Sequence, residues 1–186
     1  KVGDIKYQDY DKSGVIDGED IQRIGKSTVP EIVFGLNIGM SYKQFELTMN
    51  FQGATGFDQY LRWDPFNLES NALAIFKNSW SEDNPNAKYP RLTTHQNRSH
   101  WNYENNDFML QNNRYIRLKS LIVGNTLPQT WTRKAKLEKV RIYFSGNDLW
   151  EATSIADGFD PEMGETSNNN GYPFSRTWSF GVNIGF

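Results

Sequence analysis

The sequence has 186 residues, which is enough for one domain with its own core, and its formal net charge of -2 gives no basic face for nucleic acid. It contains no cysteine, so a disulfide scaffold and a thiolate metal site are excluded, and no apolar run approaches the roughly 18 residues of a membrane-spanning helix. The aromatic share of 15% is high for a chain whose mean hydropathy is -0.70.

An acidic stretch, DYDKSGVIDGED, runs from Asp9 to Asp20. Its spacing matches the calcium loop of an EF-hand, in which oxygen ligands recur at alternate positions and a glycine, here Gly14, allows a sharp turn at position 6. The sequence therefore predicts a structural Ca²⁺ site with the ligands Asp9, Asp11, Ser13, the Val15 carbonyl, Asp17 and Asp20.

Two features of this stretch depart from an EF-hand. Asp20 stands at position 12, where a longer glutamate usually binds in bidentate fashion, and the residues before Asp9 alternate like a strand. An Asx-rich turn that binds no metal is the alternative interpretation. Because the sequence contains no second loop of this kind, we expect only weak affinity for calcium.

Five segments farther along the chain alternate between apolar and polar residues, which predicts β-strands. They are 31–42, 45–53, 114–127, 140–150 and 177–186. In the last segment, the residues on one face are Trp178, Phe180, Val182, Ile184 and Phe186. The segment 114–127 is less regular, which is consistent with a β-bulge that shifts its phase.

The two faces of these strands favour a membrane barrel over a soluble sandwich. Strands of a sandwich also alternate, but here the polar faces are small and uncharged at mid-strand. The apolar faces are large and continuous and often end in tyrosine or tryptophan, as in strands that separate lipid from a polar lumen. The predicted fold is all-β, a transmembrane antiparallel β-barrel segment of about five strands.

The connections between these strands alternate in length. The short ones are 43–44 and 128–137, and the long ones are 54–113 and 151–174. Soluble domains seldom contain such long loops, whereas outer-membrane barrels have short periplasmic turns and long extracellular loops. We therefore expect 1–29 to form an extracellular loop with the metal site, and 30–186 to form barrel strands with two long extracellular loops and a periplasmic C-terminus.

A family resemblance is carried by seven segments: GDIKYQDYDKSGVIDGED, SYKQFELTMNFQGATG, WSEDNPNAKYPRL, DFMLQNNRYIRLKSLIVGNTLP, VRIYFSGNDLW, GFDPEM and YPFSRTWSFGVNIGF. In this order they resemble the C-terminal end of SusC-like, TonB-dependent outer-membrane transporters of Bacteroidota. The resemblance covers nearly the whole chain, and the final SFGVNIGF resembles the terminal signal for barrel assembly. The chain departs from the family pattern at Ser13, a weaker metal ligand than a carboxylate, and at Asn125, where an aromatic residue is common.

The resemblance implies a transporter rather than an enzyme. This chain would be the C-terminal barrel portion of a TonB-dependent importer of oligosaccharides, with peptides as the substrates of some relatives. The implied location is the outer membrane, and the implied partners are a SusD-like surface lipoprotein, the TonB system, outer-membrane lipid, and the plug and remaining strands of the same protein. Five strands cannot close around a lumen, so we expect this chain to be part of a larger protein.

Candidate ligand contacts are few. Trp63, Trp80, Trp101 and Trp150 are candidates for stacking on sugar rings, although such residues more often pack loops or lie at the membrane interface. His95 and His100 lack partners at metal-ligand spacing, and no nucleophile or phosphate-binding motif is present. The basic residues of TRKAKLEK fall in a short turn, where a solvated or headgroup-facing position is the simplest interpretation.

A second function remains open from the sequence. A secreted, soluble β-sandwich with a calcium loop, acting as a carbohydrate-binding module, would also show alternating strands. Solubility without detergent would distinguish this module from a barrel segment.

Overall fold

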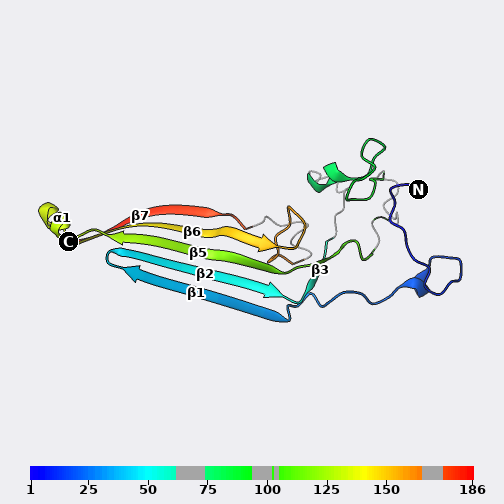
Figure 1. Ribbon diagram of the computed structural model, residues 1–186, viewed down its shortest axis with the longest axis horizontal. Helices are drawn as coiled ribbons and strands as arrows, with labels where there is room; N and C mark the ends of the chain where they lie inside the picture. The colour runs from blue at the N-terminus through cyan, green and yellow to red at the C-terminus, as the bar shows by residue number, and fades with distance from the viewer. Residues whose placement is uncertain (62–73, 94–101, 103–104, 165–173) are drawn as a thin grey trace.

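The computed structural model describes residues 1–61, 74–93, 102, 105–164 and 174–186 (Figure 1). Its main feature is an antiparallel sheet of five strands in the order β1-β2-β5-β6-β7. These strands are β1 (Ile32–Tyr42), β2 (Phe45–Thr55), β5 (Tyr115–Thr126), β6 (Lys139–Thr153) and β7 (Thr177–Gly185). A second, small sheet pairs β3 (Asp58–Tyr60) with β4 (Leu110–Asn112).

The helices within the described ranges are short. They are η1 (Gly18–Asp20), η2 (Ala74–Asn78), α1 (Gln129–Thr132) and η5 (Arg133–Ala135). None of them has the length and apolar character needed to cross a membrane. The prediction of an all-β chain is confirmed.

All five predicted strands are present, with bounds that agree to within a few residues. The largest difference is in β6, which continues to Thr153 beyond the predicted end at Trp150. The strands β3 and β4 were not predicted, because three residues are too few to show a period of two.

The pairing of the strands places their apolar residues on one face of the sheet. Leu36 lies opposite Phe51, and Ile142 lies opposite Val182. This face is open: Phe180 is 84% exposed and Val182 is 56% exposed. No second sheet covers it in the described part of the chain, as a sandwich would require. The sheet is therefore a segment of a transmembrane β-barrel, with this face against lipid.

The irregular strand β5 contains the expected bulge. Its pairing with β2 passes from Ser120 opposite Asn50 to Leu118 opposite Phe51, so Lys119 is an extra residue in β5 with no partner on β2. Because side chains alternate with a period of two, one extra residue inverts the order of the two faces. The residues on the apolar face consequently have odd numbers on the turn side of Lys119 and even numbers on the other side.

The short and long connections lie at opposite ends of the sheet, as expected. The β1–β2 turn, the β5–β6 connection with α1 and η5, and the end of β7 meet at one end, and the long connections and the N-terminal segment lie at the other (Figure 1). We call these the turn end and the loop end. The assignment of the loop end to the cell exterior remains a prediction.

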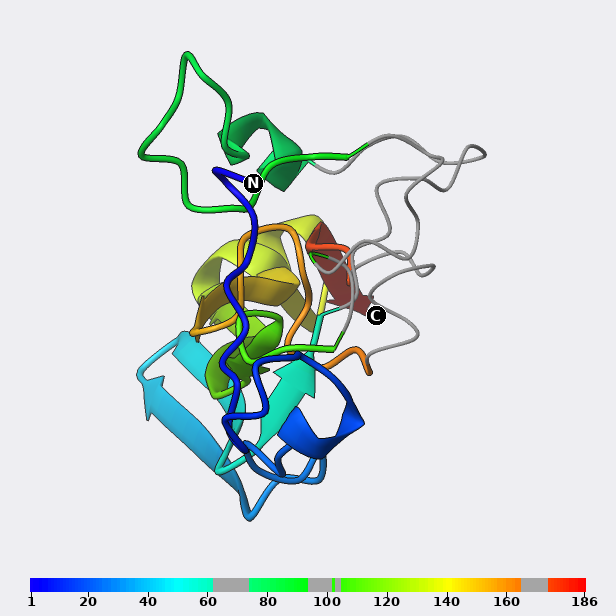
Figure 2. The ribbon, with the colours of Figure 1, turned by 90° about the vertical axis from the view of Figure 1, so that its right-hand side faces the viewer.

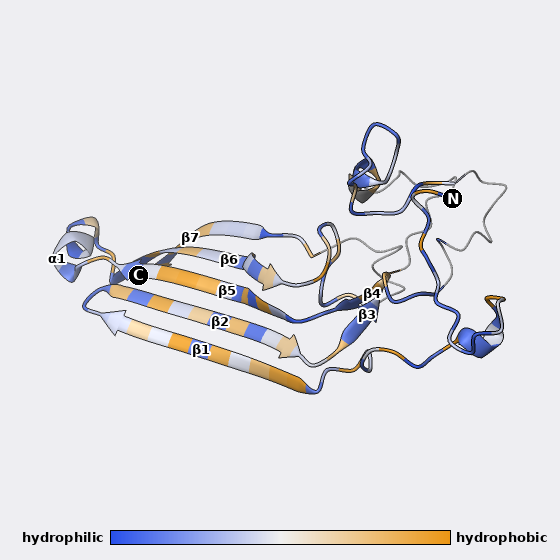
Figure 3. Ribbon diagram, turned by 45° about the vertical axis from the view of Figure 1, so that its right-hand side comes forward, coloured by the Kyte–Doolittle hydropathy of each residue, from blue (hydrophilic) through white to orange (hydrophobic). Residues whose placement is uncertain are grey.

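The second face of the sheet is polar and closely packed. Arg141 on β6 forms an ion pair with Glu46 on β2. The Tyr143 ring lies over Gly181 of β7, where a Cβ atom would collide with the ring. Hydrophilic and hydrophobic residues alternate most visibly along β2 (Figure 3).

Candidate functional site

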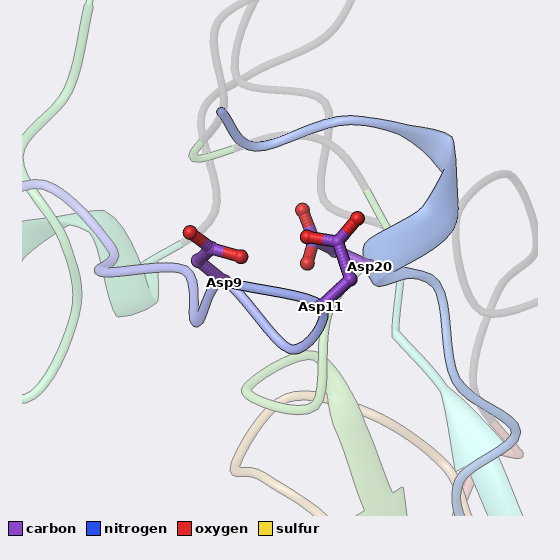
Figure 4. Close-up of side chains that lie close together, drawn as sticks. All are labelled: Asp9, Asp11 and Asp20. Atoms are coloured by element: carbon purple, nitrogen blue, oxygen red, sulfur yellow. The ribbon is translucent and has the colours of Figure 1, made fainter. Parts of the chain in front are cut away.

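Three carboxylates of the acidic stretch converge at the loop end. Oxygen atoms of Asp9, Asp11 and Asp20 lie within 4.8 Å of one another, and the side chains point toward one another (Figure 4). Gly14 has a φ of 86°, and its N–H donates to Asp9 Oδ2 at 2.8 Å. The Ser13 N–H donates to Asp11 Oδ1 at 2.9 Å, and this bond holds the pKa of the Asp11 carboxyl below its ordinary value. Such a carboxylate group has the chemistry that Ca²⁺ prefers.

The other predicted metal ligands make hydrogen bonds with neighbouring residues of the acidic stretch. Asp17 caps η1 by accepting from the Glu19 N–H at 2.9 Å, while Asp20 Oδ2 accepts from the Asp17 N–H at 3.0 Å. The Val15 carbonyl accepts a hydrogen bond from Ser13 Oγ at 3.1 Å. The structure thus brings Asp9, Asp11 and Asp20 together, and it holds Ser13, Val15 and Asp17 in other contacts.

The segment before the acidic stretch is bound to the β2–β5 connection. Asn102, whose exposed fraction is 0%, donates to Asp4 Oδ1 at 3.0 Å and accepts from the Ile5 N–H at 2.8 Å. Arg91 Nη2 donates to Asp4 Oδ2 at 3.1 Å. Burial raises the pKa of the Asp4 carboxyl, but the bonds from Arg91, the Lys1 ammonium and Asn102 together lower it by more, so its pKa lies below the ordinary value.

The two long connections lie together at the loop end (Figure 2), where their side chains share one packed core. Its buried members are Leu61, Tyr89, Met109, Ile155, Ala156 and Phe159. The Tyr89 and Phe108 rings meet edge to face, with centroids 6.0 Å apart. The described parts of these connections, together with residues 1–7, therefore form a single folded unit, which we call the loop unit.

Arg117 joins the loop unit to the sheet. Its side chain is 2% exposed and donates to Glu151 Oε2 at 3.0 Å, to Asp160 Oδ1 at 2.8 Å and to Glu162 Oε2 at 2.7 Å. Lys119 also donates to Glu162 Oε2, at 2.9 Å. Because charge-assisted hydrogen bonds are strong and directional, this ion cluster holds the segment 154–164 against the sheet.

Two buried amides support the same attachment. Asn113 Nδ2 donates to the Pro161 carbonyl and Gln59 Nε2 donates to the Met163 carbonyl, both at 2.9 Å. Sequence reasoning missed this arrangement. The available signal was Arg117 within a largely apolar strand, together with the acidic residues of the GFDPEM segment.

Two cavities open in the loop unit. One, of about 690 Å³, is lined by side chains that include Asn78, Lys88, Tyr89, Gln111 and Asp157. The other, of about 560 Å³, lies where the segment 161–164 faces the ends of β1 and β2. Amide, hydroxyl and charged groups beside aromatic rings suit the binding of a polar ligand.

The tryptophan candidates have different surroundings. Trp80 packs its ring against Gly3, where a Cβ atom would collide with the indole. Trp150 lies opposite Leu118 on the apolar face of the sheet. Trp63 and Trp101, like His95 and His100, lie outside the described residues.

Comparison with known proteins gives relatives over the whole chain, although no protein-family model matches it. TonB-dependent receptor P3 of Formosa agariphila is 31% identical over 195 residues, which cover 97% of this chain. TonB-dependent receptor P26 of the same organism is 26% identical over 199 residues, which cover 100% of it. The chain spans only 19% and 20% of the lengths of these two relatives.

Similar solved structures lead to the same group of proteins. The structure of the RagAB peptide transporter matches 96% of this chain and 20% of its own, with a TM-score of 0.68 and 26% identity. The RagAB peptide importer in its closed-closed state matches with a TM-score of 0.67 at the same identity. The relatives are named receptors and transporters, and the sheet has the lipid-facing surface of an outer-membrane barrel. The chain belongs to the SusC-like family of TonB-dependent outer-membrane transporters.

Proposed function

We propose that this chain forms the C-terminal part of the barrel wall, with part of the extracellular loops, of a TonB-dependent importer of oligosaccharides. In this proposal the loop unit faces the cell exterior, the C-terminus is periplasmic, and a SusD-like surface lipoprotein closes over the loops. The TonB system supplies the energy through other parts of the protein, and the residues described above carry out no covalent chemistry.

The observation that carries this proposal is a sheet with one lipid face and one polar face, joined at one end to a folded loop unit. The polar face offers uncharged groups such as Asn50 and Ser120, whose side chains share a hydrogen bond of 2.6 Å. The cavities of the loop unit add further amide and hydroxyl groups. Such groups match the donors and acceptors of sugar hydroxyls.

Peptide import is the second candidate. It is favoured by one specific observation, the similarity of the fold to a transporter whose structure is described as that of a peptide importer. Peptide groups present the same kinds of donor and acceptor as sugars, so the polar groups named above serve both candidates.

Binding measurements on the full-length transporter, with and without its lipoprotein, test both candidates. Isothermal titration would compare a set of neutral oligosaccharides with a set of short peptides. Oligosaccharide binding supports the first candidate, and peptide binding without oligosaccharide binding replaces it with the second. A folded complex that binds neither set would contradict both.

We also propose that Asp9, Asp11 and Asp20 bind a structural Ca²⁺ ion, with Ser13, Val15 or Asp17 recruited on binding. The convergence of the three carboxylates supports this role. The ion would offset their mutual repulsion and fix the path of the chain toward β1.

A further inference from the structure

Basic residues gather at the turn end of the sheet. Lys43 lies in the β1–β2 turn, and the β5–β6 connection and the first residue of β6 supply Arg133, Lys134, Lys136 and Lys139. All five are exposed, and the described residues show no ion pair for any of them. Together with Glu138 they carry a net charge of +4 in a chain whose net charge is -2, so the remainder of the chain carries -6.

Exposed aromatic residues lie among these cations. Trp131 in α1 is 64% exposed, and Tyr42 and Phe45, which flank the β1–β2 turn, are 72% and 60% exposed. Tyr42 and Phe45 also end the lipid-facing rows of β1 and β2. Aromatic rings combined with basic side chains are typical of the boundary between hydrocarbon and lipid headgroups.

The geometry of the turns does not account for the lysines. Lys43 has a φ of 53° and Lys136 has a φ of 56°, in the left-handed region where glycine or asparagine fits with less strain. Both connections therefore carry a lysine at a position where glycine or asparagine would be less strained.

We propose that this basic turn end binds the headgroups of anionic phospholipids in the leaflet that it adjoins. The charge is complementary to that surface, and the patch is continuous with the lipid-facing side of the sheet. The packed clusters and the two cavities described above lie at the loop end, whereas the turn end is distinguished by its exposed charge. The contact is electrostatic and weakens as salt screens it. It depends on the position of the sheet in the membrane and is independent of the substrate.

Lipid exchange on the full-length transporter tests this inference. The protein would be reconstituted in nanodiscs of phosphatidylcholine mixed with phosphatidylglycerol, and the lipids retained after exchange would be measured by native mass spectrometry. One basic residue near an anionic surface contributes about a fivefold preference. Three such contributions multiply to about 100-fold, so we expect the triple variant Arg133→Gln, Lys134→Gln, Lys136→Gln to lose at least about tenfold of its phosphatidylglycerol preference.

A matched control removes the same charge from the loop end, with Lys6→Gln, Arg23→Gln and Lys77→Gln. It should retain the preference of the unmodified transporter, and raised salt should reduce that preference in the unmodified protein. Equal retention by the turn-end variant, or an equal loss in the control, would overturn the proposal. If the turn-end variant does not fold, a preference that is insensitive to salt in the unmodified protein overturns it as well.

Discussion

The two ends of the sheet are built on different principles. At the turn end the chain reverses within a few residues, and the exposed charged side chains are mostly basic. At the loop end the connections form a core of their own, and Arg117 is buried among three carboxylates. The turn end is therefore determined by local sequence, whereas the loop end depends on contacts between residues far apart in the chain.

This difference predicts where a substitution acts. A change at the turn end should leave the fold of the loop unit intact, because no contact described above joins the two. A change in the ion cluster should loosen the loop unit and leave the strands of the barrel in place.

The largest effect is expected for Arg117→Met. Removing this cation leaves Asp160 and Glu162 buried without their main partner, which costs about 3–5 kcal/mol in local stability. Hydrogen exchange in the segment 154–164 of the full-length transporter should rise steeply. The control is Arg141→Met, whose partner Glu46 is 41% exposed on its side chain, so the cost is about 1 kcal/mol or less. Unchanged exchange in 154–164 would show that the loop unit holds itself without Arg117.

The next effect separates the two faces of the sheet. Val182→Arg places a charge on the lipid face and should cost roughly 2–4 kcal/mol near the middle of the membrane. Asn183→Arg, on the polar face of the same strand, should be tolerated far better. Folding titrations of the full-length barrel into lipid vesicles would measure both, and similar costs would mean that the assignment of faces is wrong.

A smaller effect concerns pH at the loop end. The pKa of Asp4 is lower in the folded protein than in the unfolded chain, so its contribution to stability is complete above the unfolded value of about 4 and is lost as pH falls below it. Asp4→Asn should cost roughly 1.5–3 kcal/mol at neutral pH, because the charge-assisted bonds to Arg91 are lost. Limited proteolysis of residues 1–7 across this pH range should show the change in the unmodified protein and not in the variant.

The smallest effect is that of calcium. With affinity near millimolar, millimolar Ca²⁺ stabilises the acidic stretch by only about 0.4 kcal/mol. Chelation should therefore speed exchange in residues 9–20 without unfolding the barrel. Asp20→Asn should weaken binding, whereas Asp17→Asn preserves a good helix cap and should weaken it less if Asp17 remains the cap. An equal loss in both variants would make Asp17 a ligand.

The sequence predicted the sheet well because the alternation within each short segment is enough to identify a strand. A period of two, the irregular stretch around Lys119 and the length of each connection were sufficient for the strands, the bulge and the two ends. The ion cluster was beyond such reasoning, since Arg117 and its partner Glu162 are 45 positions apart. Calcium binding stays a prediction, but the structure brings together three of the predicted ligands, Asp9, Asp11 and Asp20. The spacing of the acidic stretch could not show that Asp17 caps η1 by accepting from the Glu19 N–H.

The bulge at Lys119 divides β5 into two parts, and the side chains alternate between the two faces with opposite phase in these parts. Deletion of Lys119 would give the whole strand a single alternation. Either Arg117 would then point toward lipid, or Leu121 and Val123 would point toward the lumen. A gap or insertion of one residue in β5 of a relative therefore exchanges lipid-facing residues for lumen-facing ones, and it is not a neutral change in length. The sequences of relatives should accordingly be aligned separately on each side of this residue. Where the two alignments differ in register, the ion pair between Lys119 and Asp148 has moved or been lost.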